Sequence, residues 1–350
     1  MNRSTEHAGT STRRKPRLGF VGLGWIGRHR LESVVKADVA EVCGVHDVAA
    51  SAASEAWKST PGAVLFSSFA ELLRQDLDGV VIATPNRFHR EQAIAALERG
   101  IAVFCQKPLG RNAHETKAIV EAAQNANCLL GVDLSYRCIP AMRLVHGLVE
   151  SGALGKVFAI DARFHNAYGP DKPWFYDVSL SGGGCMLDLG VHLLDLALAP
   201  LRFPAVTRVE GTLFSNGRVL PKGNEQVEDY CVATIETGDG TAINLSSSWN
   251  LHAGRAAEIS VSFYGTGGGA SLHNVDGSFY DFVGERFHGT ETETLQTPAD
   301  SQWRWGSLAI LKWVNQLARK NEFDPDIARV ITVAEIIDRI YGHKETPREN

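Results

Sequence analysis

The 350-residue chain lacks the features that would place it in a membrane or on a nucleic acid. It has no run of about 18 or more apolar residues, the length that a membrane-spanning helix needs. It also has no block of about five like charges, and its formal net charge at pH 7 is −5. We therefore expect neither a membrane nor a nucleic acid among its partners.

Cysteines are present, but without the spacings that disulfide frameworks or zinc sites require. None of the six belongs to a CxxC pair, and most of them lie in apolar runs. This usage favours a reduced, cytoplasmic protein with no metal site. Arg13 and Arg14 resemble the start of a twin-arginine export signal, but the chain then runs directly into a glycine motif and not into the apolar core of a signal peptide.

The first half of the chain alternates short apolar runs with helix signals. Residues 1–16 are polar and are predicted to form a flexible tail. Strand–helix alternation from residue 17 on is typical of βαβ units and a parallel sheet. The predicted strands are 17–22, 39–46, 79–83, 101–105 and 128–132. Asn86 is predicted to cap a helix that Gly100 ends, and Asn112 with Glu115 predicts a capping box.

Beyond about residue 150 the predicted strands are separated by glycine-rich turns, which indicates a mainly antiparallel sheet. These strands are 156–164, 205–214, 228–236, 241–249, 257–264 and a weaker pair near 270–282. Two helices follow, near 303–320 and 325–341. The predicted fold class is therefore α/β, with a doubly wound parallel sheet followed by a second domain around an open sheet.

A glycine motif follows the first predicted strand and begins a helix. Gly22, Gly24 and Gly27 have the GxGxxG spacing, with Trp25 and Ile26 between the last two. In this context the glycines allow a tight turn, close approach of a pyrophosphate and close helix–strand packing. The helix N-terminus would offer its free N–H groups to the phosphates. We predict a dinucleotide-binding Rossmann domain over 17–137 and a substrate-binding and oligomerisation domain over 138–350.

Asp47 ends the second predicted strand, 20 residues after Gly27. A carboxylate there can accept hydrogen bonds from the ribose hydroxyls of NAD and repel the 2′-phosphate of NADP. No arginine follows it in residues 48–51 to bind that phosphate. We expect NAD(H) in preference to NADP(H). The alternative is a glycine turn without a ligand and a solvated Asp47.

A polar stripe marks the otherwise apolar helix predicted over 185–199. Its polar residues are Asp188, His192 and Asp195, which fall within an arc of about 60° on a regular helix. Ionisable groups in a buried helix are costly unless they are paired or face a polar cavity. We expect Asp188 to contact His192, to fix its tautomer and to raise its pKa, so that His192 serves as a general base. The alternative is a satisfied core network, and Asp195 fits that alternative best.

Several motifs in the same order resemble the Gfo/Idh/MocA family of oxidoreductases, from about residue 17 on. They are the glycine motif, Asp47, the ATPNxxH-like residues Thr84, Pro85, Asn86 and His89, the EKP-like Gln106-Lys107-Pro108, and Gly182–Gly184 with Asp188, His192 and Asp195. The resemblance implies a catalytic group of Lys107, Asp188 and His192. It also implies a cofactor side lined by Thr84, Pro85, Asn86, His89 and Gln106, and a sheet that builds dimers or tetramers.

Gln106 departs from the family pattern, in which a glutamate occupies this position. Glutamine keeps the hydrogen-bonding capacity but removes a negative charge beside Lys107. Lys107 itself follows a parallel strand, at the edge of the sheet where ligands bind, and there a cation can stabilise a developing alkoxide. Without the resemblance, this lysine reads as a surface charge.

Aromatic and polar residues precede the polar helix, in the loop 163–179. Arg163, His165, Tyr168, Trp174 and Tyr176 would suit a sugar or cyclitol ring, which has apolar C–H faces and hydroxyl groups. Tyr136 matches a family segment near the nicotinamide, and Trp249 with Asn250 ends a strand that could reach the site. Trp303, Trp305 and the final helix are expected to pack or to form an interface. Ordinary loop packing is the alternative for each of these residues.

The preferred hypothesis is an NAD(H)-dependent oxidoreductase acting on a secondary hydroxyl of a sugar, a sugar derivative or an inositol-like cyclitol. Two alternatives remain open. One is a glycosidase that transiently oxidises its sugar on a tightly held NAD, and the other is a non-catalytic regulator of the same fold. The expected partner is a small polyol, and the expected assembly is a homodimer or homotetramer.

Overall fold

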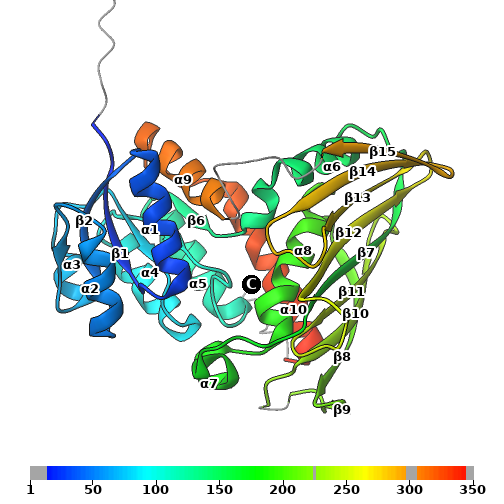
Figure 1. The fold of residues 1–350 in the computed structure, drawn as a ribbon, viewed down its shortest axis with the longest axis horizontal. Coiled ribbons are helices and arrows are strands. Elements are labelled where there is room, and N and C mark those ends of the chain that lie inside the picture. Colours follow the sequence, from blue (N-terminus) through cyan, green and yellow to red (C-terminus); the bar gives the residue numbers. More distant parts are fainter. Residues whose placement is uncertain (1–13, 224–225, 297–305, 344–350) are drawn as a thin grey trace, which may run out of the picture.

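The computed structural model describes residues 14–223, 226–296 and 306–343, which form two sheets with helices between them (Figure 1). Most of the predicted tail, as well as Trp303 and Trp305, lies outside the described residues. In the described ranges, no helix is long and apolar enough to cross a bilayer.

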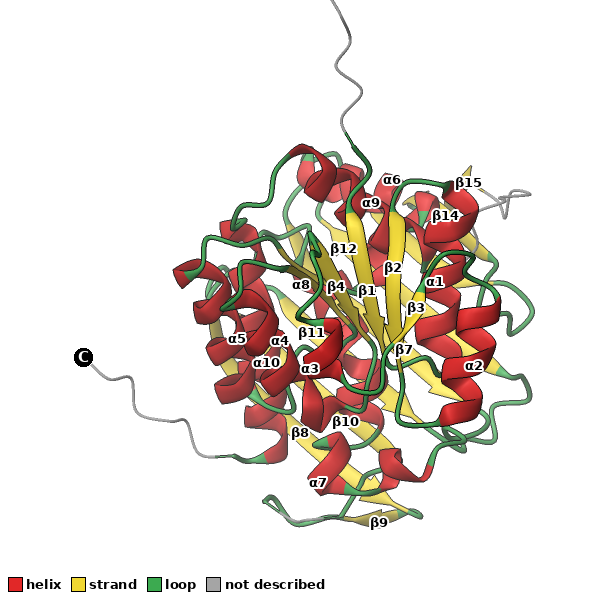
Figure 2. Ribbon diagram, turned by 90° about the vertical axis from the view of Figure 1, so that its left-hand side faces the viewer, coloured by secondary structure: helices red, strands yellow, loops and turns green. Residues whose placement is uncertain are grey.

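The first sheet is parallel and has the strand order β3-β2-β1-β4-β5-β6. Its strands are β1 (Arg17–Val21), β2 (Glu41–His46), β3 (Val64–Leu65), β4 (Gly79–Ile82), β5 (Ala102–Cys105) and β6 (Leu130–Val132). Helices cover both faces of the sheet, as Figure 2 shows, so every residue of β4 and β5 is buried. These helices include α1 (Trp25–Ala37), α2 (Ala50–Lys58), α3 (Phe69–Leu72), α4 (His89–Leu97) and α5 (Ala113–Asn125). The predicted Rossmann arrangement is confirmed; of the six strands of this sheet, the sequence pattern missed the short β3.

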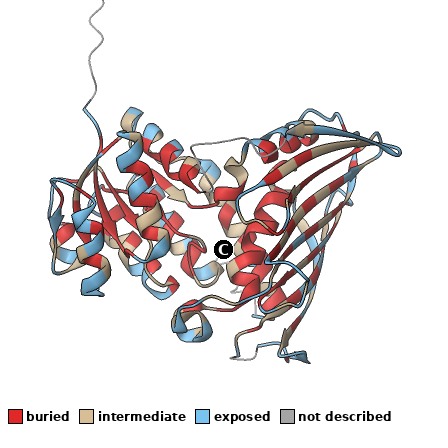
Figure 3. Cartoon of the chain, viewed as in Figure 1, coloured by how far each residue is buried: buried red, intermediate tan, exposed pale blue. Residues whose placement is uncertain are grey.

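The second sheet is larger, mainly antiparallel, and ordered β15-β14-β13-β12-β7-β11-β10-β8-β9, with β7 and β11 as its parallel pair. Its strands are β7 (Val157–Asn166), β8 (Val206–Ser215), β9 (Arg218–Val219), β10 (Tyr230–Thr237), β11 (Ala242–Ser248), β12 (Ala257–Gly265), β13 (Gly269–Asn274), β14 (Phe282–His288) and β15 (Glu291–Gln296). Burial alternates along β10 and β12, because one face packs on helices and the other lies open (Figure 3).

Helices fill the space between the two sheets. They are α6 (Pro140–Glu150), α7 (Val178–Ser181), the π-helical turn η4 (Met186–Gly190), α8 (Val191–Leu198) and α10 (Arg329–Tyr341). Shorter 3-10 segments are η1 (Asn86–Phe88), η2 (Ser135–Cys138), η3 (Pro173–Tyr176) and η5 (Pro325–Ala328). Buried side chains of α8 and α10 join the core of the larger sheet.

Helix α9 (Ser307–Arg319) returns to the parallel sheet from the far end of the chain. Trp313 lies against Gly79 and Gly131, where a Cβ would come within 2.7 and 2.6 Å of its ring. Ile310, Trp313 and Val314 share one buried cluster with β1 and α1. The predicted boundary at 137/138 stays a prediction, and α9 completes the core of the first sheet from beyond that boundary.

The predicted caps turn out differently. Asn112 Oδ1 accepts the Glu115 backbone N–H at 2.9 Å, as expected of a capping box, but the Glu115 carboxylate binds Arg111 instead of the Asn112 N–H. Asn86 does not cap α4: its side-chain amide donates to the Ser181 carbonyl at 2.7 Å and so ties the end of β4 to α7. The cap prediction for Asn86 is therefore wrong, because a tertiary partner takes its amide.

Candidate active site

The glycine loop between β1 and α1 forms a tight turn with an open outer side. Gly22 has a φ of +80°, and a Cβ there would lie 2.4 Å from the Ala83 carbonyl carbon. A Cβ on Gly27 would lie 1.8 Å from the Gly22 oxygen, whereas one on Gly24 would meet nothing within 4 Å. No side chain caps α1 at Gly24. The loop therefore leaves room for an anionic group at the N-terminus of α1, which fits the pyrophosphate of a dinucleotide.

Trp25, Ile26 and Asp47 lie next to the glycine loop. Trp25 is 54% exposed at the start of α1, and Ile26 is partly buried. Asp47 follows β2, where its Oδ2 accepts the Leu23 N–H at 2.5 Å and its Oδ1 accepts the Ala49 N–H at 2.7 Å. Two backbone donors thus hold this carboxylate at the carboxyl edge of the sheet, beside the glycine loop.

The segment after β4 is held together by its own polar groups. Thr84 Oγ1 donates to Gln92 Oε1 at 2.7 Å, and Pro85 leads into η1. His89 is fully buried, with Nδ1 2.9 Å from the Pro108 oxygen and Nε2 2.8 Å from the Thr84 oxygen. The imidazole links this segment to the one that carries Lys107, and burial lowers its pKa. The structure thus places His89 beneath the expected cofactor side, not on its surface.

Lys107 and Asp188 meet across the two halves of the chain. Lys107 Nζ donates to Asp188 Oδ1 at 2.5 Å and to the Asp188 backbone oxygen at 2.7 Å. Their side chains are 18% and 17% exposed. The second carboxylate oxygen, Oδ2, accepts the Trp249 indole N–H at 3.1 Å. Both carboxylate oxygens of Asp188 therefore accept a hydrogen bond. One donor is Lys107, which follows β5, and the other is Trp249, which follows β11.

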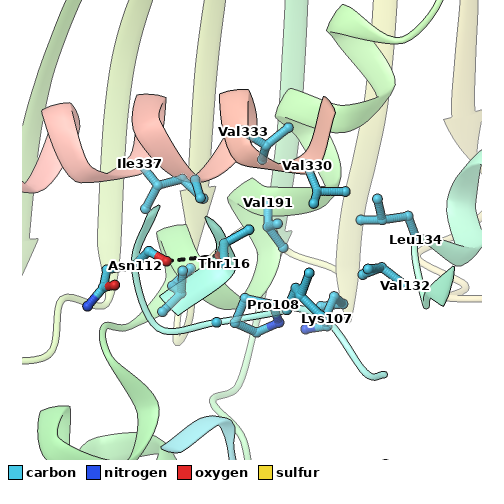
Figure 4. A pocket seen from close by; sticks show the side chains of 14 residues that line it. Lys107, Pro108, Asn112, Thr116, Val132, Leu134, Val191, Val330, Val333 and Ile337 are labelled. Atoms are coloured by element: carbon cyan, nitrogen blue, oxygen red, sulfur yellow. Dashed lines mark hydrogen bonds between the residues drawn. The ribbon is translucent and has the colours of Figure 1, made fainter. Parts of the chain in front are cut away.

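The segment around Lys107 also forms one wall of a small cavity, shown in Figure 4. Pro108 and Val191 line it together with Val330, Val333 and Ile337 of α10. The lining is mostly apolar, so the stem of Lys107 and the neighbouring Pro108 rest on packed side chains. This packing holds the lysine segment against α8 and α10.

His192 lies near this ion pair but is not hydrogen-bonded to it. Its ring packs edge-on against Tyr136, with centroids 4.8 Å apart, and near Phe164 at 6.5 Å. Nδ1 is buried and has no hydrogen-bond partner among the described residues. Burial above all, and then the charges of Lys107 and Arg30, lower the pKa of His192 well below its usual 6.5. The imidazole is therefore neutral at pH 7.

The predicted contact between Asp188 and His192 is wrong, and so is the predicted rise in the pKa of His192. Asp188 lies in the π-helical turn η4, whereas His192 begins the regular turns of α8. A spacing of four allows two side chains to meet, but it does not ensure that they do, because either group can bind a partner from another segment. The Asp188 carboxylate binds Lys107 and Trp249 instead.

Asp195 has the structural role that its burial suggested. Its carboxylate forms a two-pronged ion pair with Arg137 of η2, and Asp195 is only 1% exposed. The pair ties η2, at the junction of the two halves, to α8. Tyr136 of the same segment is 3% exposed and supports the His192 ring, so it lies behind the imidazole.

Aromatic side chains gather over Asp188 from the loop after β7. Phe175 and Tyr176 meet the Trp249 ring edge-on, at centroid distances of 6.2 and 5.7 Å. Trp174 stacks on Phe175 at 3.8 Å, and Tyr168 is 54% exposed beside Phe279. The loop therefore brings Trp174 and Tyr176 to the Trp249 side of Asp188, whereas Tyr168 contacts Phe279.

Arg163 and His165 are not brought to this site. Side chains alternate along β7, and Phe164 faces His192, so its two neighbours lie on the opposite face of the sheet. There Arg163 pairs with Glu258 at 3.4 Å and His165 Nε2 lies 2.9 Å from Ser246 Oγ. The prediction that Arg163 and His165 bind the substrate of this chain is therefore wrong. Apolar residues alternate along β7 at Ile160, Ala162 and Phe164, and this pattern in the sequence predicts which face of the strand is buried.

Gln106 belongs to a buried network that the sequence pattern did not reveal. Its amide donates to Asp133 Oδ2, and that oxygen also accepts Arg30 Nε at 2.5 Å. The acid directly follows β6, and the arginine lies in α1. A buried arginine and a buried aspartate, 103 positions apart, thus meet next to Lys107.

A glycine loop at the carboxyl edge of a parallel sheet, with a fixed carboxylate on the next strand, defines a dinucleotide-binding Rossmann protein. Residues 16–134 match the profile of the oxidoreductase family with an NAD-binding Rossmann fold, and residues 142–271 match that of the GFO/IDH/MocA C-terminal domain. The chain belongs to the Gfo/Idh/MocA family of oxidoreductases.

Curated relatives are named for sugar chemistry. The levoglucosan dehydrogenase of Pseudarthrobacter phenanthrenivorans is 32% identical over 213 residues, which are 55% of this chain and 54% of that protein. The D-glucoside 3-dehydrogenase of Escherichia coli is 32% identical over 213 residues, 58% of this chain and 61% of that protein. These two matches span only about half to three-fifths of the relatives. A putative UDP-kanosamine synthase oxidoreductase subunit of Amycolatopsis mediterranei is 30% identical over 274 residues, 73% of this chain and 74% of that protein.

Solved structures share the fold along most of the chain. A levoglucosan dehydrogenase in complex with NADH and L-sorbose has a TM-score of 0.79 at 24% identity, and covers 94% of this chain and 96% of that chain. A 3-ketoreductase from Actinomadura kijaniata, in complex with NADP, has a TM-score of 0.79 at 20% identity, with 94% and 98% covered.

Proposed function

We propose that this protein is an NAD(H)-dependent oxidoreductase that interconverts a secondary hydroxyl and a ketone on a sugar, a sugar derivative or an inositol-like cyclitol. The observation that carries the proposal is the convergence of Lys107, Asp188 and a neutral His192 at the edge of the sheet that holds the glycine loop. The sugar dehydrogenases among the relatives support the choice of substrate class.

A bound nicotinamide supplies the acceptor or donor of the hydride. Lys107 provides the electrostatic part: its ammonium has three N–H donors, two of which are used on Asp188. The third can bind the substrate oxygen and stabilise alkoxide character as the C–H bond breaks. Asp188 fixes the direction of this ammonium, and Trp249 holds the carboxylate from its other side.

His192 provides the acid–base part. Because its pKa is lowered by burial and by nearby cations, the imidazole is neutral at pH 7 and can accept the hydroxyl proton. In the reverse direction the protonated ring returns that proton to the alkoxide. The charge that it gains lies near Lys107, which disfavours imidazolium and helps the return of the proton.

We propose NAD(H) as the preferred cofactor, on the strength of Asp47. Backbone donors hold its carboxylate at the end of β2, and each oxygen keeps a lone pair for a ribose hydroxyl. A 2′-phosphate at this place would meet a fixed negative charge. We expect a higher kcat/KM with NAD than with NADP, and the opposite ratio would contradict this assignment.

We also propose that the open face of the larger sheet forms the contact of a homodimer or homotetramer. Val232 and Tyr264 lie on this face, 42% and 38% exposed. Exposed apolar groups on a broad sheet favour association. Light scattering of the purified protein should give a mass of two or four chains, and a monomer at micromolar concentration would contradict the proposal.

The activity is tested with a panel of inositols, aldoses, uronates and anhydrosugars, each incubated with NAD while NADH absorbance is followed. We expect turnover of at least one member, and its loss in His192→Ala. His114, an exposed histidine of α5, gives the matched control His114→Ala, which should keep wild-type activity. No turnover of any member with either cofactor, or full activity of His192→Ala, would contradict the proposed function.

A further inference from the structure

A buried polar network of Arg30, Gln106 and Asp133 lies directly behind Lys107. Arg30 Nε and the Gln106 amide nitrogen both donate to Asp133 Oδ2. The Arg30 and Asp133 side chains are 1% and 0% exposed, and Gln106 is 7% exposed. The three residues come from α1, the end of β5 and the end of β6, so the network spans the edge of the parallel sheet at which the cofactor would bind.

The carboxylate of Asp133 determines which way the Gln106 amide points. A carboxylate only accepts hydrogen bonds, so the amide must turn its NH2 group toward Asp133. The carbonyl oxygen Oε1 is then directed away from Asp133, and it accepts no hydrogen bond from the described residues. Gln106 immediately precedes Lys107 at the end of β5, so this acceptor lies at the carboxyl edge of the parallel sheet.

The network also requires a single negative charge. A buried guanidinium without a carboxylate is strongly unfavourable, and two adjacent buried carboxylates would repel each other. The charge on Asp133 meets this need, because residue 106 is neutral. The other oxygen, Asp133 Oδ1, is buried and has no hydrogen-bond partner in the part of the chain that the structure describes, so the carboxylate is held chiefly by Arg30 and Gln106.

We propose that Asp133 is a positioning residue of the site, which fixes the Gln106 amide so that Oε1 accepts a hydrogen bond from the nicotinamide carboxamide. The inference rests on the proposed function for its choice of ligand. If the proposal holds, positions 106 and 133 act together: one of them must carry an amide and the other a carboxylate. Exchanging the two groups should therefore preserve the network better than changing either one alone.

The test compares Asp133→Asn, Gln106→Glu and the double variant, using NADH fluorescence to measure binding and thermal unfolding to measure stability. Each single change should weaken NADH binding about tenfold or more, the loss of one hydrogen bond to a charged group. The double exchange should recover affinity to within about threefold of the wild type, since it restores one amide and one carboxylate. An additive loss in the double variant, or wild-type affinity in the single variants, would overturn the proposal.

Matched controls come from an exposed amide–carboxylate pair on the larger sheet. Asn244 Nδ2 donates to Asp161 Oδ1 at 3.1 Å, remote from the glycine loop, so Asp161→Asn should leave NADH affinity unchanged. Should Asp133→Asn fail to fold, Gln106→Leu leaves the Arg30–Asp133 pair in place and removes only the amide. Gln106→Leu should lose about tenfold in NADH affinity, and unchanged affinity would overturn the proposal.

The NADH-binding measurements use no substrate, so their outcome does not depend on whether the proposed function is correct. Rescue of NADH affinity by the double exchange, without turnover of any polyol, would support the network and contradict the activity. Turnover of a polyol without such rescue would do the reverse.

Discussion

Replacing Trp249 with phenylalanine should remove one specific contact of the Lys107–Asp188 pair. The wild-type indole N–H donates to Asp188 Oδ2 at 3.1 Å, while the ring meets Phe175 and Tyr176 edge-on. Trp249→Phe keeps an aromatic ring at this place but removes the donor. Asp188 then keeps only the contact with Lys107, and its carboxylate is free to rotate.

The magnitude follows from the kind of hydrogen bond and from its exposure. A hydrogen bond to a charged group contributes about 1.5–3 kcal/mol. Asp188 is 17% exposed, so water replaces part of the lost contact and the lower end applies. About 1.5 kcal/mol of lost transition-state stabilisation corresponds to roughly a tenfold fall in kcat/KM.

The assay is steady-state oxidation of the best polyol of the panel, with thermal unfolding as a check of folding. Trp57 provides a matched control, because its indole N–H also donates to a single oxygen, that of Ala63, at 2.8 Å. Trp57→Phe should leave kcat/KM unchanged. If Trp249→Phe loses no more activity than Trp57→Phe, the role given to this contact in holding Asp188 is refuted.

Three further predictions concern the charges around the site. Lys107→Met should lower kcat by about 10²–10³, the effect of removing one oxyanion-stabilising donor, and a steady-state fall below tenfold would contradict that role. Because burial and nearby cations lower the pKa of His192 from 6.5, the ring stays neutral below that pH. The pH profile of kcat/KM for oxidation should thus fall only well below pH 6.5, and an acid limb centred at 6.5 would disprove this. Arg137→Met leaves Asp195 buried without its cation, which should cost about 3 kcal/mol of unfolding free energy in urea; a change below about 1 kcal/mol, within the ordinary range for surface substitutions, would count against the structural role of that pair.

Much of the fold follows from periodicity and turn chemistry. The parallel strands are continuous apolar runs because helices cover both of their faces, and the glycine motif is recognisable because Gly22 and Gly27 each lie where a Cβ would collide with backbone. The short β3 was not predicted, because its two exposed residues, Val64 and Leu65, are too few to show the periodicity of a strand.

The site was less predictable, for reasons of geometry. The spacing of Asp188 and His192 predicts a contact between them, but the Asp188 carboxylate binds Lys107 and Trp249, which come from distant segments of the chain. The contact of Asp188 with Trp249 joins residues 61 positions apart, and that of Arg30 with Asp133 joins residues 103 apart. Such pairings depend on how segments distant in the sequence pack within each half of the chain, which local sequence patterns do not contain.

The central claim is that a C–H hydrogen of a polyol passes to the nicotinamide at a site made by Lys107, Asp188 and His192. The most direct measurement uses a carbon-deuterated sugar or cyclitol from the panel, with mass spectrometry of the cofactor after reaction with NAD. We expect reduced cofactor carrying one deuterium from the wild-type protein, and almost none from His192→Ala or Lys107→Met. Reduced cofactor without deuterium, or equal labelling by those two variants, would contradict the account.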